Sequence, residues 1–187
     1  MKTVQLKTWQ WTLVLAGLAL ATAAHAAEPA KKGVEVDACK LLSDKDVGAA
    51  IGLAVDPGVR NDAGFTEANA YSSTCLWAVS ADKDVKKPNL PLGGKRFAIL
   101  NVQSWPPGTG AGRSFVRAFK AAGEQHLIKN KPEDIKIGDE AVWWGSGVAV
   151  HKGDYSFGMS VHLIDDPERQ RGMEEALSKQ IVARLPK

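Results

Sequence analysis

Hydrophobic and polar residues alternate most clearly near the C-terminal end of the chain, over residues 155–164. Phe157, Met159, Val161 and Leu163 occupy every second position, and serine, glycine and histidine lie between them. Successive side chains of a strand point to opposite faces of its sheet. The alternation therefore predicts a strand that buries one face and leaves the other polar.

Other segments carry the composition of strands and are bounded by turn residues. Cys75, Trp77 and Val79 share one face of such a segment, whereas residues 96–105 begin apolar on both faces, which predicts a central strand. Residues 56–73 are rich in Gly, Asn, Asp and Ser and predict a loop. The predicted strands are 74–81, 96–105, 140–144, 148–152 and 155–164.

Three segments have helical signals. Ser43 and Asp46 have the spacing of a capping box, and Gly52 ends the first helix. In the last helix Glu174 and Glu175 are expected on the solvated side, opposite an apolar stripe. The predicted helices are 43–51, 113–122 and a C-terminal helix that opens at Asp166, its N-cap, and Pro167.

The elements follow the order α-β-β-α-β-β-β-α, which predicts an α+β fold. The simplest architecture is an antiparallel sheet with helices packed on one face and one disulfide. The expected organisation is a secretory signal peptide at 1–26, a flexible leader at 27–34 and a single α+β domain at 35–187.

The N-terminal residues have the pattern of a secretory signal peptide. Lys2 and Lys7 precede an apolar run, and Ala24-His25-Ala26 supplies the small residues of a cleavage site. Cleavage after Ala26 predicts a periplasmic or secreted protein. Cys39 lies too far beyond that site to carry a lipid, so no membrane anchor is expected.

Cys39 and Cys75 are both in the mature part of the chain. An even pair in an oxidising compartment predicts a disulfide, and the alternative is two separate buried thiols. Removing Lys2 and Lys7 from the 24 basic residues leaves 22, against 21 acidic residues. This near balance does not predict nucleic-acid binding, which needs a concentrated basic face.

The segment Cys39-Lys40-Leu41-Leu42-Ser43 leads to Ile51-Gly52, and Cys75-Leu76-Trp77 follows later. This loosely resembles small bacterial cell-envelope proteins of unknown function, in which a cysteine precedes a short helix ending in glycine and a second cysteine lies near an aromatic residue. The resemblance implies a helix-on-sheet fold and a disulfide, and it implies no activity.

No catalytic or metal-binding residues are predicted. Residues 106–114 imitate a phosphate loop, but Pro107 replaces the first glycine and Arg113 the lysine, which leaves a turn or a weak anion site. His151 and His162 fall on one sheet face, too far apart to share a metal, and are expected to be solvated. Adjacent acidic residues point apart, so a carboxylate pair for catalysis is not recognisable.

Two tryptophans are the predicted binding residues. If Gly145-Ser146-Gly147 forms the loop, Trp144 pairs with Val148 and faces the core, and Trp143 then points outward. Trp105, at a strand end, is the second exposed candidate. A large exposed aromatic residue commonly anchors a partner, although a covered second face or another register would bury both.

These observations favour an exported soluble binding protein, without enzymatic activity or cofactor. Its expected partner is another envelope or secreted protein, for example an enzyme that it inhibits or to which it confers immunity. One alternative is a periplasmic carrier with a small-molecule ligand between sheet and helices. A second alternative is a hydrolase with an unrecognised carboxylate site.

Overall fold

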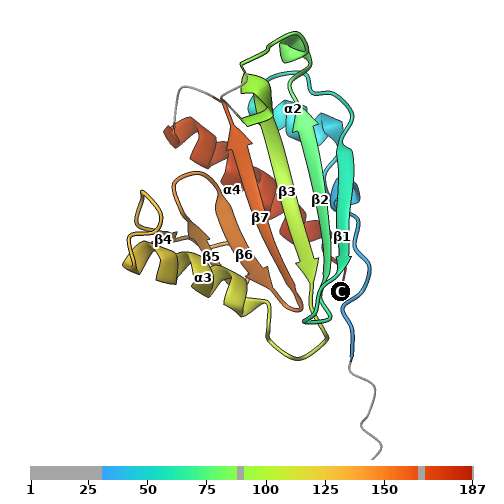
Figure 1. The fold of residues 1–187 in the computed structure, drawn as a ribbon, viewed down its shortest axis with the longest axis vertical. Helices are drawn as coiled ribbons and strands as arrows, with labels where there is room; N and C mark the ends of the chain where they lie inside the picture. Colours follow the sequence, from blue (N-terminus) through green and yellow to red (C-terminus); the bar gives the residue numbers. More distant parts are fainter. Residues whose placement is uncertain (1–30, 88–90, 164–166, 187) are drawn as a thin grey trace, which may run out of the picture.

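A seven-stranded antiparallel sheet forms the centre of the structure, a computed structural model that describes residues 31–87, 91–163 and 167–186 (Figure 1). The strands are β1 (Val59–Phe65), β2 (Tyr71–Ala78), β3 (Phe97–Ser104), β4 (Glu133–Asp134), β5 (Glu140–Trp143), β6 (Val148–Lys152) and β7 (Tyr155–His162). They lie in the order β1-β2-β3-β7-β6-β5-β4. The last strand of the chain therefore occupies the middle of the sheet, and the predicted antiparallel sheet is confirmed.

One face of the sheet holds the main hydrophobic core, covered by α1 (Ala38–Leu41), α2 (Asp44–Ile51) and α4 (Pro167–Arg184). The period of two directs alternate residues of three neighbouring strands toward these helices. Each such large side chain contributes about 1.5–3 kcal/mol when it is fully buried. Side chains with no exposed surface include Cys75, Trp77, Leu100, Val102, Phe157 and Met159 of the strands and Leu177 and Ile181 of α4.

The helix α3 (Arg113–Glu124) packs on the opposite face, over β5, β6 and β7. Val116 meets Val142 and Ala149 there in a second, smaller cluster, and Phe115 and Phe119 pack against it. Helices thus lie on both faces of the sheet, and the expected packing on one face is wrong. The sequence pattern showed that α3 has an apolar side but not which face of the sheet that side covers.

Two strands and one α-helix of the described residues were not predicted from the sequence. The predicted loop 56–73 includes β1, whose residues are almost all exposed because it is an edge strand with little apolar surface to bury. The two-residue strand β4 and the separate turn α1 are too short to show periodicity. The predicted capping box of Ser43 and Asp46 and the left-handed C-cap at Gly52 are confirmed.

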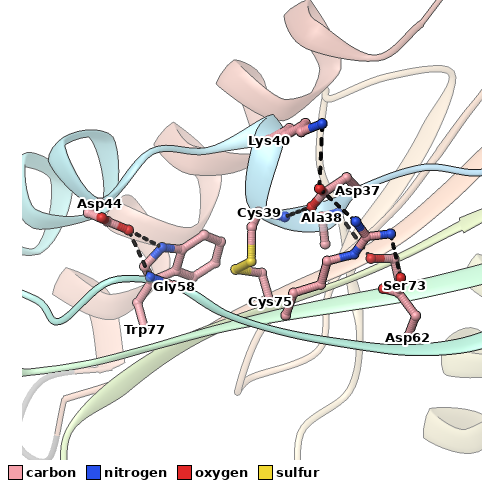
Figure 2. The surroundings of a disulfide bond; sticks show 11 residues. Asp37, Ala38, Cys39, Lys40, Asp44, Gly58, Asp62, Ser73, Cys75 and Trp77 are labelled. Carbon is pink, nitrogen blue, oxygen red and sulfur yellow. Dashed lines mark hydrogen bonds and ion pairs between the residues drawn. A yellow bond between two sulfur atoms is a disulfide. The ribbon is translucent and has the colours of Figure 1, made fainter.

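The predicted disulfide is present and joins Cys39 of α1 to Cys75 of β2 (Figure 2). Asp44, at the start of α2, accepts hydrogen bonds from the Trp77 indole at 3.0 Å and from the Gly58 backbone at 2.9 Å. A Cβ atom at Gly58 would lie 2.7 Å from the Cys75 sulfur, so only glycine lets the chain pass beside the disulfide. The alternative of two separate thiols is excluded.

The leader expected at 27–34 is held to the sheet at its C-terminal end. The Gly33 N–H donates to the Asn69 carbonyl at 2.8 Å, and the Val34 N–H donates to Ser104 Oγ at 3.0 Å. The predicted signal peptide at 1–26 and the predicted N-cap Asp166 lie outside the described residues. Within those residues, no helix has the length and apolar character needed to cross a membrane.

Replacing Cys39 and Cys75 by serine is expected to lower the free energy of unfolding by about 4 kcal/mol, because the bond closes a loop between residues 36 positions apart. Urea denaturation of both proteins measures this difference. Reductant should shift the midpoint of the wild-type protein and leave that of the double variant unchanged. Equal midpoints in the absence of reductant would show that the bond adds no stability.

Candidate functional site

Half of the sheet's second face carries none of the helices that the structure describes, because α3 covers β5 to β7 only (Figure 1). In the view of Figure 1, α4 crosses behind the sheet, and β1, β2 and β3 lie unobstructed in front of it. The side chains on this side form rows across neighbouring strands. The rows are Val59–Leu76–Ile99–Ser160, Asn61–Thr74–Asn101 and Ala78–Phe97–His162, and together they are called the open face.

The open face exists because β2, β3 and β7 alternate between fully buried and half-buried residues. The first row is aliphatic over three strands, and Val59 at its edge is 63% exposed. The second row is polar, with Asn101 Nδ2 donating to Thr74 Oγ1 at 2.8 Å. This hydrogen bond fixes the amide orientation, so the face presents fixed polar groups beside an aliphatic strip.

No residue of the open face is formally charged, although Asp, Glu, Lys and Arg make up 24% of the chain. Its one titratable group, His162, is stacked on Phe97 with ring centroids 4.3 Å apart. Burial lowers the pKa of His162, which keeps the imidazole neutral near pH 7. The whole face is therefore uncharged at neutral pH.

The margins of the open face are different in character. On one side Phe115 of α3 lies against Gly158 of β7, where a Cβ atom would come within 3.4 Å of the ring. At the end where β2 connects to β3 lie four lysines that form no ion pair with any described residue. They are Lys83, Lys86, Lys87 and Lys95.

Trp143, the first predicted binding residue, lies in the core and is only 8% exposed. It pairs with Val148, and Trp144 belongs to the turn, where its N–H donates to the Gly147 carbonyl. The turn is one residue longer than expected, and a slip of one residue exchanges the two faces. Trp144 is therefore the tryptophan on the second face, where it stacks on Phe119.

The indole of Trp143 has a structural role. Its Nε1 donates to Glu174 of α4 at 3.1 Å, and the Arg171 guanidinium lies 4.8 Å from the ring centroid. Both contacts join β5 to α4 across the main core. The expectation that Trp143 is exposed is wrong, and as folded this side chain cannot anchor a partner.

Trp105, the second predicted binding residue, is half-buried just beyond β3, beside the start of α3. Its Nε1 donates to Ser156 Oγ at 2.8 Å, and its backbone N–H donates to the Asp154 carbonyl at 2.8 Å. Trp105 thus borders the same side of the sheet as the open face. It is not the freely exposed ring that the sequence predicted.

Glu174 is a buried carboxylate with a raised pKa, although the sequence pattern predicted it on the solvated side of the last helix. It is only 1% exposed, and burial raises its pKa to about 7. Its second oxygen accepts a hydrogen bond from the Val161 N–H at 3.0 Å. A raised pKa often marks a catalytic acid, but this group lies between α4 and the sheet, where it holds the two together.

The remaining candidate groups are buried or already hydrogen-bonded within the protein. His151 is only 3% exposed, contrary to the expected solvated state, and its ring nitrogens have no hydrogen-bond partner among the described residues. In the imitation phosphate loop, the Gly108 N–H already binds the Asp154 carboxylate at 2.9 Å. No group of three or more His, Cys, Asp or Glu side chains suited to a metal occurs within residues 31–87, 91–163 and 167–186.

No protein-family model matches the chain, and neither the curated proteins nor the solved structures contain a significant match.

Glu174→Gln is expected to change how stability depends on pH. The folded-state pKa of Glu174, about 7, lies above the unfolded value near 4.5, so the folded protein binds the extra proton between these values. The free energy of unfolding of the wild-type protein, relative to that of Glu174→Gln, should fall by about 3 kcal/mol from pH 4.5 to 7 and then stay level.

The measurement is urea denaturation of both proteins at intervals of pH, with the difference between them plotted. Taking the difference cancels the opposite contribution of His162, whose pKa is lowered on folding. Glu175→Gln is the matched control, because that neighbouring carboxylate pairs with Arg171 near the surface. If the difference between wild type and Glu174→Gln does not change with pH, Glu174 is not a buried carboxylate with a raised pKa.

Proposed function

We propose that this chain is an exported binding protein and that the open face docks a folded protein partner. The observation that carries the proposal is the absence of charge from a half-buried, helix-free sheet surface in a chain that is 24% charged. Interface centres are depleted in charged residues, since each buried charge needs a partner. Burying polar groups that already bond to each other, such as Asn101 and Thr74, also costs little free energy, because they keep their hydrogen bond.

The lysines at the margin indicate the kind of partner. None of Lys83, Lys86, Lys87 and Lys95 forms an ion pair with a described residue, although the charge of Lys95 also acts on Asp82. Their ammonium groups can therefore meet acidic groups on another protein. Charges at the rim of an interface mainly raise the association rate and select the partner. We therefore infer a partner whose contact surface has a neutral centre and an acidic edge on one side.

The disulfide supports an exported location, since such bonds persist in oxidising compartments. Together with the signal-peptide pattern ending at Ala26, it favours the periplasm or the extracellular medium. The partner is then another envelope or secreted protein, such as a hydrolase. The mechanism is steric, because covering an enzyme's surface inhibits it without any catalytic group in the inhibitor.

A small-molecule carrier remains the second candidate, in a changed form. The space between sheet and α4, where a ligand was expected, is occupied by Phe157, Met159 and Leu177, which have no exposed surface. A hollow of about 340 Å³ beside Phe97 and His162 offers a different place for a ligand. This observation favours a surface site at the end of the open face.

Leu76→Glu and Ile99→Glu are each expected to weaken partner binding about tenfold or more, because the new carboxylate would be buried without a counter-charge. The partner is captured from the envelope fraction of the source cells by a photo-crosslinking residue at position 99. Unlabelled wild-type protein should compete for the crosslink, and the two glutamate variants should not.

Ala183→Glu is the matched control, since it adds the same charge at an exposed position of α4, behind the main core. A crosslinking residue at position 183 should give no competed product. Thermal unfolding of all variants checks that the half-buried substitutions leave the fold intact. Competition by the glutamate variants equal to that of wild type, or equal crosslinking at 99 and 183, would refute docking on the open face.

A further inference from the structure

A hollow of about 340 Å³ lies where the open face meets the connection from β2 to β3. Sites for small ligands begin at about this volume. The sheet supplies Phe97, His162 and the neighbouring Leu163, and Gln170 of α4 adds an amide. The opposite side is formed by the connection, which supplies two lysines, so the hollow has an apolar floor and a basic rim.

The floor is a pair of stacked rings. Phe97 and His162 face each other directly in the register of β3 and β7, with ring centroids 4.3 Å apart and planes inclined by 28°. Phe97 is 7% exposed, so most of its ring is covered by neighbouring groups. Because the imidazole is neutral near pH 7, the floor presents aromatic surface without charge.

Lys87 is held in place at the rim. Its backbone N–H donates to the carbonyl of Gly93 at 2.6 Å, and Gly93 belongs to the turn η2 (Pro91–Gly94). Its aliphatic stem lies against Gly94, where a Cβ atom would come within 2.8 Å of Lys87 Cβ. Gly94 has a φ of +80°, so the turn needs glycine both for its backbone conformation and for this contact.

The two lysines of the rim form no ion pair in the described part of the chain, although the charge of Lys95 also acts on Asp82. Neither Lys87 nor Lys95 lies within ion-pair distance of a carboxylate there, and the described side chains that line the hollow include no Asp or Glu. Gln170 Oε1 accepts a hydrogen bond from the Leu163 N–H at 3.3 Å, which leaves the amide NH₂ as a further donor. The polar groups of the hollow therefore match an acceptor with negative charge.

We propose that this hollow binds a carboxylate that is attached to a planar apolar group. The ammonium groups of Lys87 and Lys95 would hold the carboxylate by charge-assisted hydrogen bonds, and the planar group would pack on the rings of Phe97 and His162. A free aromatic acid and the C-terminal carboxylate of an aromatic residue share this chemistry. The site does not depend on docking of a protein partner at the open face.

The test is a titration of the ¹⁵N-labelled exported protein with benzoate, followed by NMR. Benzoate should shift the amide resonances of Phe97, His162 and Leu163 in a saturable way. Neutral benzamide should bind more weakly than benzoate, by about tenfold or more. N-acetylphenylalanine and its amide form the second pair of probes. Tighter binding of N-acetylphenylalanine than of benzoate indicates a chain terminus as the natural ligand, and the reverse order indicates a free acid.

The double variant Lys87→Gln with Lys95→Gln should lose about tenfold or more in benzoate affinity. The matched control is Lys83→Gln with Lys86→Gln, which removes the same charge from the same connection but not from the hollow. It should bind benzoate like the wild-type protein. Equal binding of benzoate and benzamide, an equal loss in the control, or no saturable shift at these three amides would each overturn the proposal. The assay contains no protein partner, so its result is separate from that of the docking experiment.

Discussion

The structure depends on the antiparallel pairing of β3 with β7, which joins the two halves of the sheet over the full length of both strands. This register directs Leu100 and Met159 into the main core and leaves Ile99 and Ser160 on the opposite side. A shift by one residue would exchange the two sets and expose the core. The same pairing that closes the core therefore also creates the open face.

The two halves of the second face differ in the residues beside their apolar positions, since the open face places a polar row next to its aliphatic row. The helix α3 packs on small apolar residues of β5 to β7, namely Val142, Ala149 and Gly158. On β2 and β3 the corresponding positions include Thr74 and Asn101, which bond to each other and gain little from a helix above them. The helix-free half is thus a consequence of side-chain chemistry in the strands.

Much of the fold follows from local patterns, and the errors have identifiable physical causes. The alternation in β7 and the capping box at Ser43 need no tertiary information, and both are confirmed. The exposure of Trp143 depended on the length of one turn, which sequence alone left open. Glu174 was predicted to face solvent because it is an acidic residue, although it lies one turn from Leu177 on the buried stripe of α4. The open face could not be predicted, because it requires knowing that α3 crosses to the other side and stops at β7.

The burial of Trp143 changes how this protein could recognise a partner. Interfaces with aromatic anchors concentrate their binding energy in a few pockets, whereas the open face offers a flat aliphatic strip of Val59, Leu76 and Ile99 beside hydrogen-bonding groups. Each contact with such a surface would contribute a modest free energy of binding. The surface would discriminate between partners mainly by excluding those with an unsuitable arrangement of charge. A partner that placed a charge against this neutral strip would lose the hydration of that charge and find no compensating group. In the proposed complex the marginal lysines, which form no ion pair with a described residue, would act in the opposite sense and favour acidic groups only at the edge of the contact. Selectivity would then arise from the arrangement of charge around a neutral centre.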